Sequence, residues 1–180
     1  MKEEQDFIKR LNTRETKEAA FKELLKLYKE RLYWHIRHIV KSHDDADDIL
    51  QNTFIKIYKS IHNFKGDSKL YSWMYRIATN ESITFINKNS KRMHLSSEDY
   101  QNHAINNLKA DVYFEADEIK IKLQKAIASL PEKQQLVFNM KYFEDIKYKD
   151  MAEILETSEG ALKASYHIAV KKIEAILKND

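Results

Sequence analysis

The 180-residue sequence contains no cysteine, only two glycines and only one proline. Without cysteine the chain forms neither a disulfide nor a thiolate metal site, and two glycines leave little material for hairpin turns or phosphate-binding loops. No run of about 20 apolar residues is present to span a bilayer, and the opening stretch MKEEQDF lacks the apolar segment of a signal peptide. We therefore expect a cytoplasmic protein without membrane insertion.

The residues that dominate the chain are lysine, glutamate, leucine, isoleucine and alanine, a composition typical of helices. Hydrophobic residues make up 43% of the sequence, which is enough to fill one medium core or two small ones. The net charge of +3 is unevenly spread, with +6 in residues 1–92, −4 in residues 93–117 and +1 in residues 118–180. The composition predicts an all-α protein with an acidic middle segment.

This middle segment reads HLSSEDYQNHAINNLKADVYFEAD from His94 and has no sustained helical period. Its serine, asparagine and aspartate content is typical of a linker. We therefore predict two small helical domains, residues 1–93 and 118–180, joined by an acidic linker over residues 94–117.

In the first domain, apolar residues recur at three- and four-residue steps in three stretches. These stretches cover residues 21–39, 46–61 and 70–85, and the last follows a break at Gly66. Such periods indicate amphipathic helices, and three helices sharing one core is the simplest packing.

The second of these helices begins with a cluster of aspartates: Asp44, Asp45, Asp47 and Asp48. We expect Asp44 or Asp45 to cap the helix and the later pair to lie in its first turn, where each carboxylate contributes about 0.3–1 kcal/mol through the helix dipole. That explanation does not account for Gln51 one turn further along.

A metal site is the alternative interpretation of this cluster, because His43 and Asp44 form the pair found in metal phosphohydrolases. Such a site needs further ligands, and the other histidines show no matching pattern.

The second domain predicts a short helix over residues 148–155, a break at residues 156–158 and a longer apolar-striped helix over residues 162–176. Ser158 is the expected N-cap of the longer helix. This is the pattern of a helix-turn-helix, whose second helix can enter the major groove. Lys163, His167 and Lys171 repeat every four residues opposite the apolar stripe. A DNA-facing surface and an ordinary solvated face both remain open interpretations of that row.

Both halves of the sequence resemble the bacterial sigma factors of RNA polymerase, specifically the small two-domain extracytoplasmic-function (ECF) type. The resemblance is carried by DADDILQNTFIKIY from Asp45, by NFKGDSKLYSWMYRIATNESITFI from Asn63, and by SLPEKQQLVFNMKYFEDIKYKDMAEILETSEGALKASYHIAVKKI from Ser129. It covers roughly residues 17–178. Helix-turn-helix look-alikes are common, but two specific motifs in the family's order and spacing are strong evidence.

The resemblance implies that the helix with the aspartate cluster docks on the polymerase core. The implied core-binding residues are Asp47, Asp48, Gln51 and Phe54. The sequence departs from the family at Asn52, where an acid is usual. The acidic linker resembles the connector that threads the enzyme's nucleic-acid channels, and a plain flexible tether is the alternative.

The resemblance further implies that the third helix and its preceding loop open the promoter −10 element and hold an extruded base. The implied −10 residues are Asn63, Phe64, Lys65, Gly66, Asp67, Arg76, Asn80, Asn87, Lys88, Lys91 and Arg92. Asn80 matches an asparagine common in the family motif. Trp73 falls on the apolar stripe, which favours a core position over base stacking. For Tyr71 and Tyr75 the sequence favours neither of these two roles.

The longest helix of the second domain is implied to bind the −35 element. The implied −35 residues are Ser158, Lys163, His167, Lys171 and Lys172. The sequence departs from the family at Ser165, Ile168 and Val170, where many relatives carry arginine. Fewer cations mean fewer phosphate contacts and a shallower salt dependence of DNA binding.

The function implied is that of a dissociable RNA polymerase subunit that recognises promoters, opens the −10 strands and starts transcription. It has no catalytic residue and no cofactor. Its implied partners are the polymerase core, duplex DNA at −35 and melted DNA at −10, and an anti-sigma factor is a candidate further partner. The alternative is a stand-alone helix-turn-helix regulator, since SEGALKASYHIAVKKI would suit a response-regulator output domain, but that leaves the aspartate cluster without a role.

Overall fold

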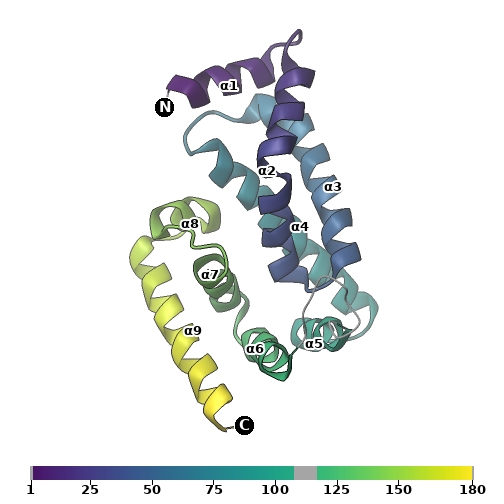
Figure 1. Ribbon diagram of the computed structural model, residues 1–180, viewed down its shortest axis with the longest axis vertical. Coiled ribbons are helices and arrows are strands. Elements are labelled where there is room, and N and C mark those ends of the chain that lie inside the picture. The colour runs from purple at the N-terminus through teal and green to yellow at the C-terminus, as the bar shows by residue number, and fades with distance from the viewer. Residues whose placement is uncertain (1, 108–116, 180) are drawn as a thin grey trace.

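The structure is a computed structural model that describes residues 2–107 and 117–179 (Figure 1). Within these ranges every regular element is a helix and no strand occurs, so the predicted all-α fold class is confirmed. None of the described helices is long and apolar enough to cross a membrane.

The first domain contains α1 (Lys2–Asn12), α2 (Lys17–Val40), α3 (His43–Ser60), the 3₁₀ turn η1 (Ile61–Asn63) and α4 (Leu70–Arg92). Helices α2, α3 and α4 pack on one another, as their apolar periods predicted. Their shared core includes Leu32, Ile36, Ile57 and Met74, all fully buried. Helix α1, which was not predicted from the sequence, lies across the end of this bundle and buries Leu11.

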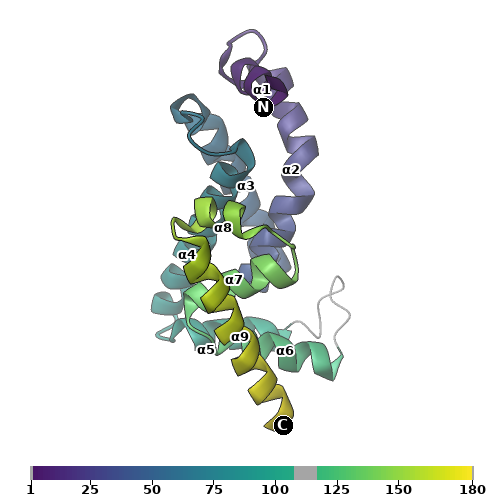
Figure 2. The same cartoon turned by 90° about the vertical axis from the view of Figure 1, so that its left-hand side faces the viewer.

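The remaining helices are α5 (Ser97–Asn107), α6 (Glu118–Ala128), α7 (Glu132–Tyr142), α8 (Tyr148–Leu155) and α9 (Glu159–Asn179). Short α8 and long α9 form the predicted helix-turn-helix, and they pack with α6 and α7 (Figure 2). The turn passes through Glu156 in the left-handed conformation, with φ 51°. The Ser158 hydroxyl accepts a hydrogen bond from the Ala161 N–H at 3.2 Å, so Ser158 caps α9 as expected.

Helix α5 lies within the segment predicted as a linker without helical period. Ser96 starts it by accepting a hydrogen bond from the Asp99 N–H at 3.0 Å while donating to the Asp99 carboxylate at 2.6 Å. Ile105 is fully buried beside Ile121 and Ala128. The sequence did not predict this helix because a cap and tertiary burial stabilise it and a sustained apolar period does not. The assignment of residues 94–117 as a linker stays a prediction.

The two domains pack against each other. Figure 1 shows α7 and α8 beside α2 and α4, and Met140, Met151, Ile154 and Leu162 of the second domain belong to the same apolar cluster as the core of the first. A smaller cluster around Ile127 holds α6, α7 and α9 together. We call the contact of α7 and α8 with α2 and α4 the domain seam.

Candidate functional site

The aspartate cluster lies further inside α3 than its sequence predicted. Lys41 ends α2 in the left-handed conformation, and the Ser42 hydroxyl then accepts a hydrogen bond from the Asp45 N–H at 3.4 Å. Because Ser42 is the N-cap, the predicted capping role of Asp44 or Asp45 was wrong, and these two residues occupy the first turn. Asp47 and Asp48 fall in the second turn, where the helix dipole stabilises them less.

The implied core-binding residues divide between surface and core. Asp48 and Gln51 are exposed, and Asp47 is half-exposed on the same helix. Phe54 is buried and meets the Phe21 ring edge-on, with centroids 6.3 Å apart. The structure therefore presents an acidic and amide surface on α3, with Phe54 beneath it.

Beside this surface lies an apolar hollow of about 540 Å³ between α2 and α3 that sequence reasoning missed. Its lining includes Leu25, Phe54, Ile55 and Tyr58, with Gln51 at its edge. Ile55 is half-exposed, which is unusual for a large aliphatic side chain. The sequence could have indicated this hollow, because Ile55 and Tyr58 are apolar but do not lie on the core-facing stripe of the helix.

His43 has partners within the protein. Its Nδ1 atom lies 2.7 Å from the Tyr33 hydroxyl, and its Nε2 atom lies 3.7 Å from the Asp47 carboxylate. Among the described residues, no group of three or more histidine, aspartate or glutamate side chains is arranged to hold a metal ion.

The last residue of η1 and the loop that follows it carry five of the implied −10 residues. Asn63, Lys65 and Asp67 are exposed, and Gly66 has φ 80°, a conformation that glycine adopts without strain. Phe64 is half-buried, with its ring centroid 5.3 Å from that of Trp73. Trp73 itself packs against the core, as its position on the apolar stripe predicted.

Helix α4 carries the other implied −10 residues. Asn80, Lys88, Lys91 and Arg92 are exposed. Asn87 is half-buried, and its side-chain oxygen accepts a hydrogen bond from the Ser97 hydroxyl at 3.2 Å. Arg76 is paired with Glu156 of the second domain at 2.5 Å. Of the two tyrosines for which the sequence favoured neither a core position nor base stacking, Tyr75 is buried and Tyr71 is half-buried.

The implied −35 residues of α9 line its outer face. Lys163, His167, Lys171 and Lys172 are all exposed, whereas Leu162, Ala169 and Ile173 face inward and are buried. Lys163 lies over the Tyr148 ring, and Lys172 donates to the Gln134 side chain at 3.3 Å. The geometry presents a cationic row to the outside of the helix-turn-helix.

A buried polar cluster in the domain seam was not predicted. His35 of α2 is 1% exposed, and its Nδ1 atom lies 3.0 Å from the Glu144 carboxylate. Its Nε2 atom lies 2.8 Å from the Thr79 hydroxyl, which itself donates to the Tyr75 carbonyl. Both ring nitrogens of His35 therefore have a hydrogen-bond partner inside the domain seam. No local pattern could reveal a contact between residues 109 positions apart.

Glu144 is the acid at the centre of this cluster. Burial alone would raise its pKa, but the attraction and hydrogen bonds of His35 and His38 outweigh burial and lower the pKa from 4.5 to about 2. Burial also lowers the pKa of His38, and Glu144 opposes that effect. The cluster therefore favours an ionised Glu144 in the folded protein.

Acidification is expected to weaken the fold through Glu144. Because its pKa is lower in the folded than in the unfolded protein, its contribution is complete above pH 4.5 and is lost as the pH falls toward about 2. The loss is on the order of 3 kcal/mol. Thermal unfolding of the wild type and of Glu144→Gln between about pH 6 and about pH 2.5 should show their stability difference shrinking with acid. The matched control Asp145→Asn alters an exposed neighbour and should show little difference at any pH. A pH-independent effect of Glu144→Gln would contradict the expectation.

Two known family descriptions match the chain, one in each domain. Sigma-70 region 2 matches residues 24–92, and Sigma-70, region 4 matches residues 120–173. The chain is 28% identical over 167 residues to the RNA polymerase sigma-H factor of Pseudomonas aeruginosa, covering 88% of this chain and 86% of that protein. It is 29% identical over 156 residues to the ECF RNA polymerase sigma factor SigW of Bacillus subtilis, with coverage of 82% and 83%.

Two solved structures share the fold along most of the chain. CnrH, in complex with the cytosolic domain of CnrY, aligns with a TM-score of 0.65 and 19% identity over 91% of this chain and 90% of that one. The sigma factor RpoE of Bartonella quintana, in complex with the anti-sigma factor NepR, aligns with a TM-score of 0.65 and 21% identity. That alignment covers 89% of this chain and 98% of that one.

Proposed function

This chain belongs to the sigma-70 family of bacterial RNA polymerase sigma factors, as a member of the ECF type, and from that premise we propose which of its surfaces bind the polymerase core and which bind promoter DNA. A sigma factor directs promoter recognition and transcription initiation. The observation that best supports this function is that Sigma-70 region 2 matches the first domain and Sigma-70, region 4 matches the second, in that order. The stand-alone regulator is not favoured, because it requires no counterpart of the first domain.

The α3 surface is proposed to bind the polymerase core. Asp47, Asp48 and Gln51 are accessible there, and the neighbouring apolar hollow offers area that a partner can bury. Acidic side chains steer a basic partner to the surface, while apolar burial supplies most of the affinity. In this proposal Phe54 contributes through the hollow that it lines, since its side chain is otherwise buried.

The loop before α4 and the exposed flank of α4 are proposed to bind the −10 element. Asn80 offers an amide that can read a base edge, and Lys88, Lys91 and Arg92 offer charges for phosphates further along the helix. Gly66 allows the loop to turn close to an extruded base. The exposed cations of α9 are proposed to bind duplex DNA at −35, with Ser158 at the helix N-terminus near a phosphate.

The remaining assignments follow from the family. Sigma factors are not catalytic enzymes, and we propose no covalent chemistry and no cofactor for this chain. We propose that it acts in the cytoplasm and that an anti-sigma factor holds it, as NepR does in the complex with the Bartonella quintana protein. The predicted domain limits and the channel-threading role of residues 94–117 stay proposals, and most of that acidic segment's C-terminal half lies outside the described residues.

The proposed function is tested by reconstitution with RNA polymerase core. The purified chain should co-elute with core and should support run-off transcription from a cognate promoter, selected from genomic fragments by the holoenzyme. Core alone and the chain alone are the controls, and neither should give promoter-specific transcripts. A protein that binds duplex DNA tightly by itself and fails to bind core would instead be a stand-alone regulator.

A further inference from the structure

We propose that Ile168 of α9 recognises a thymine in the −35 element, by packing its side chain against the 5-methyl group that thymine presents in the major groove. This inference deepens the proposed function of α9 and rests on it. The isoleucine side chain carries neither a charge nor a hydrogen-bonding group, so it can recognise a base only through apolar contact. Its position on α9, its exposure and the charged residues around it all fit such a contact.

Ile168 lies on the outer face of α9, in the N-terminal half of the helix. The buried stripe of α9 runs through Leu162, Ala169 and Ile173. At about 100° per residue, Ile168 points well away from that stripe, and its side chain is 44% exposed. In a helix-turn-helix, the N-terminal part of the second helix contacts base edges in the major groove. Ile168 is therefore placed where a side chain can reach a base.

The residues around Ile168 leave room for a base and supply charge for the DNA backbone. Ala161 and Ala164, on the two preceding turns of the same face, are exposed and short, so Ile168 extends further from the helix than they do. Lys171 and Lys172 are exposed on the following turn. Cations at these positions attract the phosphates that border the groove. The phosphate contacts position the helix, and the apolar contact then distinguishes the base.

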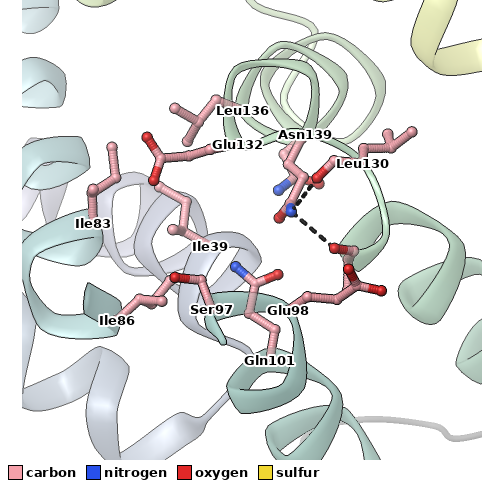
Figure 3. A pocket seen from close by; sticks show the side chains of 12 residues that line it. Ile39, Ile83, Ile86, Ser97, Glu98, Gln101, Leu130, Glu132, Leu136 and Asn139 are labelled. Atoms are coloured by element: carbon pink, nitrogen blue, oxygen red, sulfur yellow. Dashed lines mark hydrogen bonds between the residues drawn. The ribbon is translucent and has the colours of Figure 1, made fainter. Parts of the chain in front are cut away.

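The helix that carries Ile168 is supported by its neighbours, because α9 packs on α6, α7 and α8. Helix α7 is in turn tied to the end of α6. The Gln135 amide donates to the Ala128 and Leu130 carbonyls at 3.0 and 2.7 Å, and both hydrogen bonds are dashed in Figure 3. Such support matters because the contact of a side chain with a base depends on a fixed position of its helix.

The chemistry of the major groove makes thymine the favoured base. Among the DNA bases only thymine presents a methyl group there, whereas the others present hydrogen-bond donors and acceptors. An isoleucine that displaces water from those polar groups leaves them without a partner, which disfavours binding. Contact with the thymine methyl instead removes apolar surface from water on both sides. Ile168 therefore favours an A·T pair whose thymine lies next to it.

The test uses holoenzyme and the cognate promoter, with each −35 thymine on either strand replaced in turn by deoxyuridine. Deoxyuridine lacks only the 5-methyl group and keeps every hydrogen-bonding group of thymidine. At the thymine next to Ile168, wild-type holoenzyme should bind about fourfold more weakly, which is the effect of one methyl group no longer removed from water. 5-Bromodeoxyuridine should restore the affinity, because bromine has nearly the size of a methyl group. Affinities are measured by competition against the unmodified promoter.

Matched variants separate the Ile168 contact from other effects. Ile168→Ala should remove the discrimination between thymine and deoxyuridine at that position. Ile119→Ala makes the same change at an exposed isoleucine of α6 and should keep the discrimination. Lys163→Ala should weaken binding to both DNAs and keep their ratio, because a phosphate contact does not depend on the base methyl. Since an apolar contact releases no counterion, the ratio should also stay constant as salt is raised.

Ile168→Arg tests the same position with the opposite chemistry. An arginine side chain can donate two hydrogen bonds to N7 and O6 of guanine. The preference at the base pair identified with deoxyuridine should therefore move from A·T to G·C. An arginine variant that still prefers thymine there would place the determinant on another residue and overturn the proposal.

Failure of the Ile168 contact can be distinguished from failure of the proposed function of α9. Protection of the −35 element together with an unchanged ratio in Ile168→Ala would overturn the contact with Ile168 alone. Equal binding of thymine and deoxyuridine at every −35 position by the wild type would have the same meaning. A holoenzyme that starts transcription without protecting the −35 element, and that Lys163→Ala does not weaken, would instead contradict the proposed role of α9.

Discussion

Replacing Asp47 and Asp48 together with lysine is expected to abolish binding to RNA polymerase core while leaving the helical circular dichroism signal nearly unchanged. Both side chains are accessible in the second turn of α3, beyond the N-terminal turn where the helix dipole acts most strongly. Placing cations against a basic partner costs several kcal/mol, and about 3 kcal/mol already corresponds to a loss of roughly a hundredfold in affinity. The effect on binding should therefore be far larger than the effect on folding.

The measurement is fluorescence anisotropy of the labelled protein titrated with core, together with thermal melting of each variant. Glu15→Lys combined with Glu18→Lys is the matched control, since it makes the same charge change at exposed positions before and at the start of α2. The control should bind core within a few-fold of the wild type. Undiminished core binding by the Asp47 and Asp48 variant would remove these residues from the interface.

Local sequence pattern predicted most of the helices, because each of α2, α3, α4 and α9 buries one face at a regular period. It failed for α5, whose polar sequence contains a single fully buried large aliphatic side chain, Ile105. It also placed the start of α3 too late, since Ser42 and the left-handed Lys41 together begin the helix before the aspartates. These errors concern places where capping and tertiary contact decide the structure and apolar periodicity does not.

The candidate surfaces could be predicted as far as they depend on one helix. The exposed row on α9 and the exposed acids of α3 follow from helical spacing alone. Their relation to the other domain could not be predicted, because Arg76 and Glu156 are 80 positions apart, and His35 and Glu144 are 109 positions apart. Such pairs are brought together by the packing of whole domains, on which a local period carries no information.

Asn80→Ala is expected to reduce promoter opening by the holoenzyme and to change the preference at one base of the −10 element. The Asn80 side chain is exposed on α4 and can both donate to and accept from a base edge. Losing one such contact costs about 1–3 kcal/mol for the preferred base and less for the others. Lys91→Ala, one of the proposed phosphate contacts, should weaken binding to all −10 sequences alike, and Lys163→Ala should act at the −35 element instead.

The decisive assay is permanganate footprinting of the −10 region, with and without polymerase core, using wild-type and Asn80→Ala protein on promoters that vary at each −10 base. Opening a promoter costs more than the few phosphate contacts of a first domain with net charge +6 can supply, so opening should require core to hold the bent and separated strands. Reactive thymines should therefore appear only in the holoenzyme and should weaken with Asn80→Ala. Strand opening by the free protein would overturn this mechanism. A base preference identical in wild type and Asn80→Ala would remove Asn80 from the −10 site, even if overall opening were reduced.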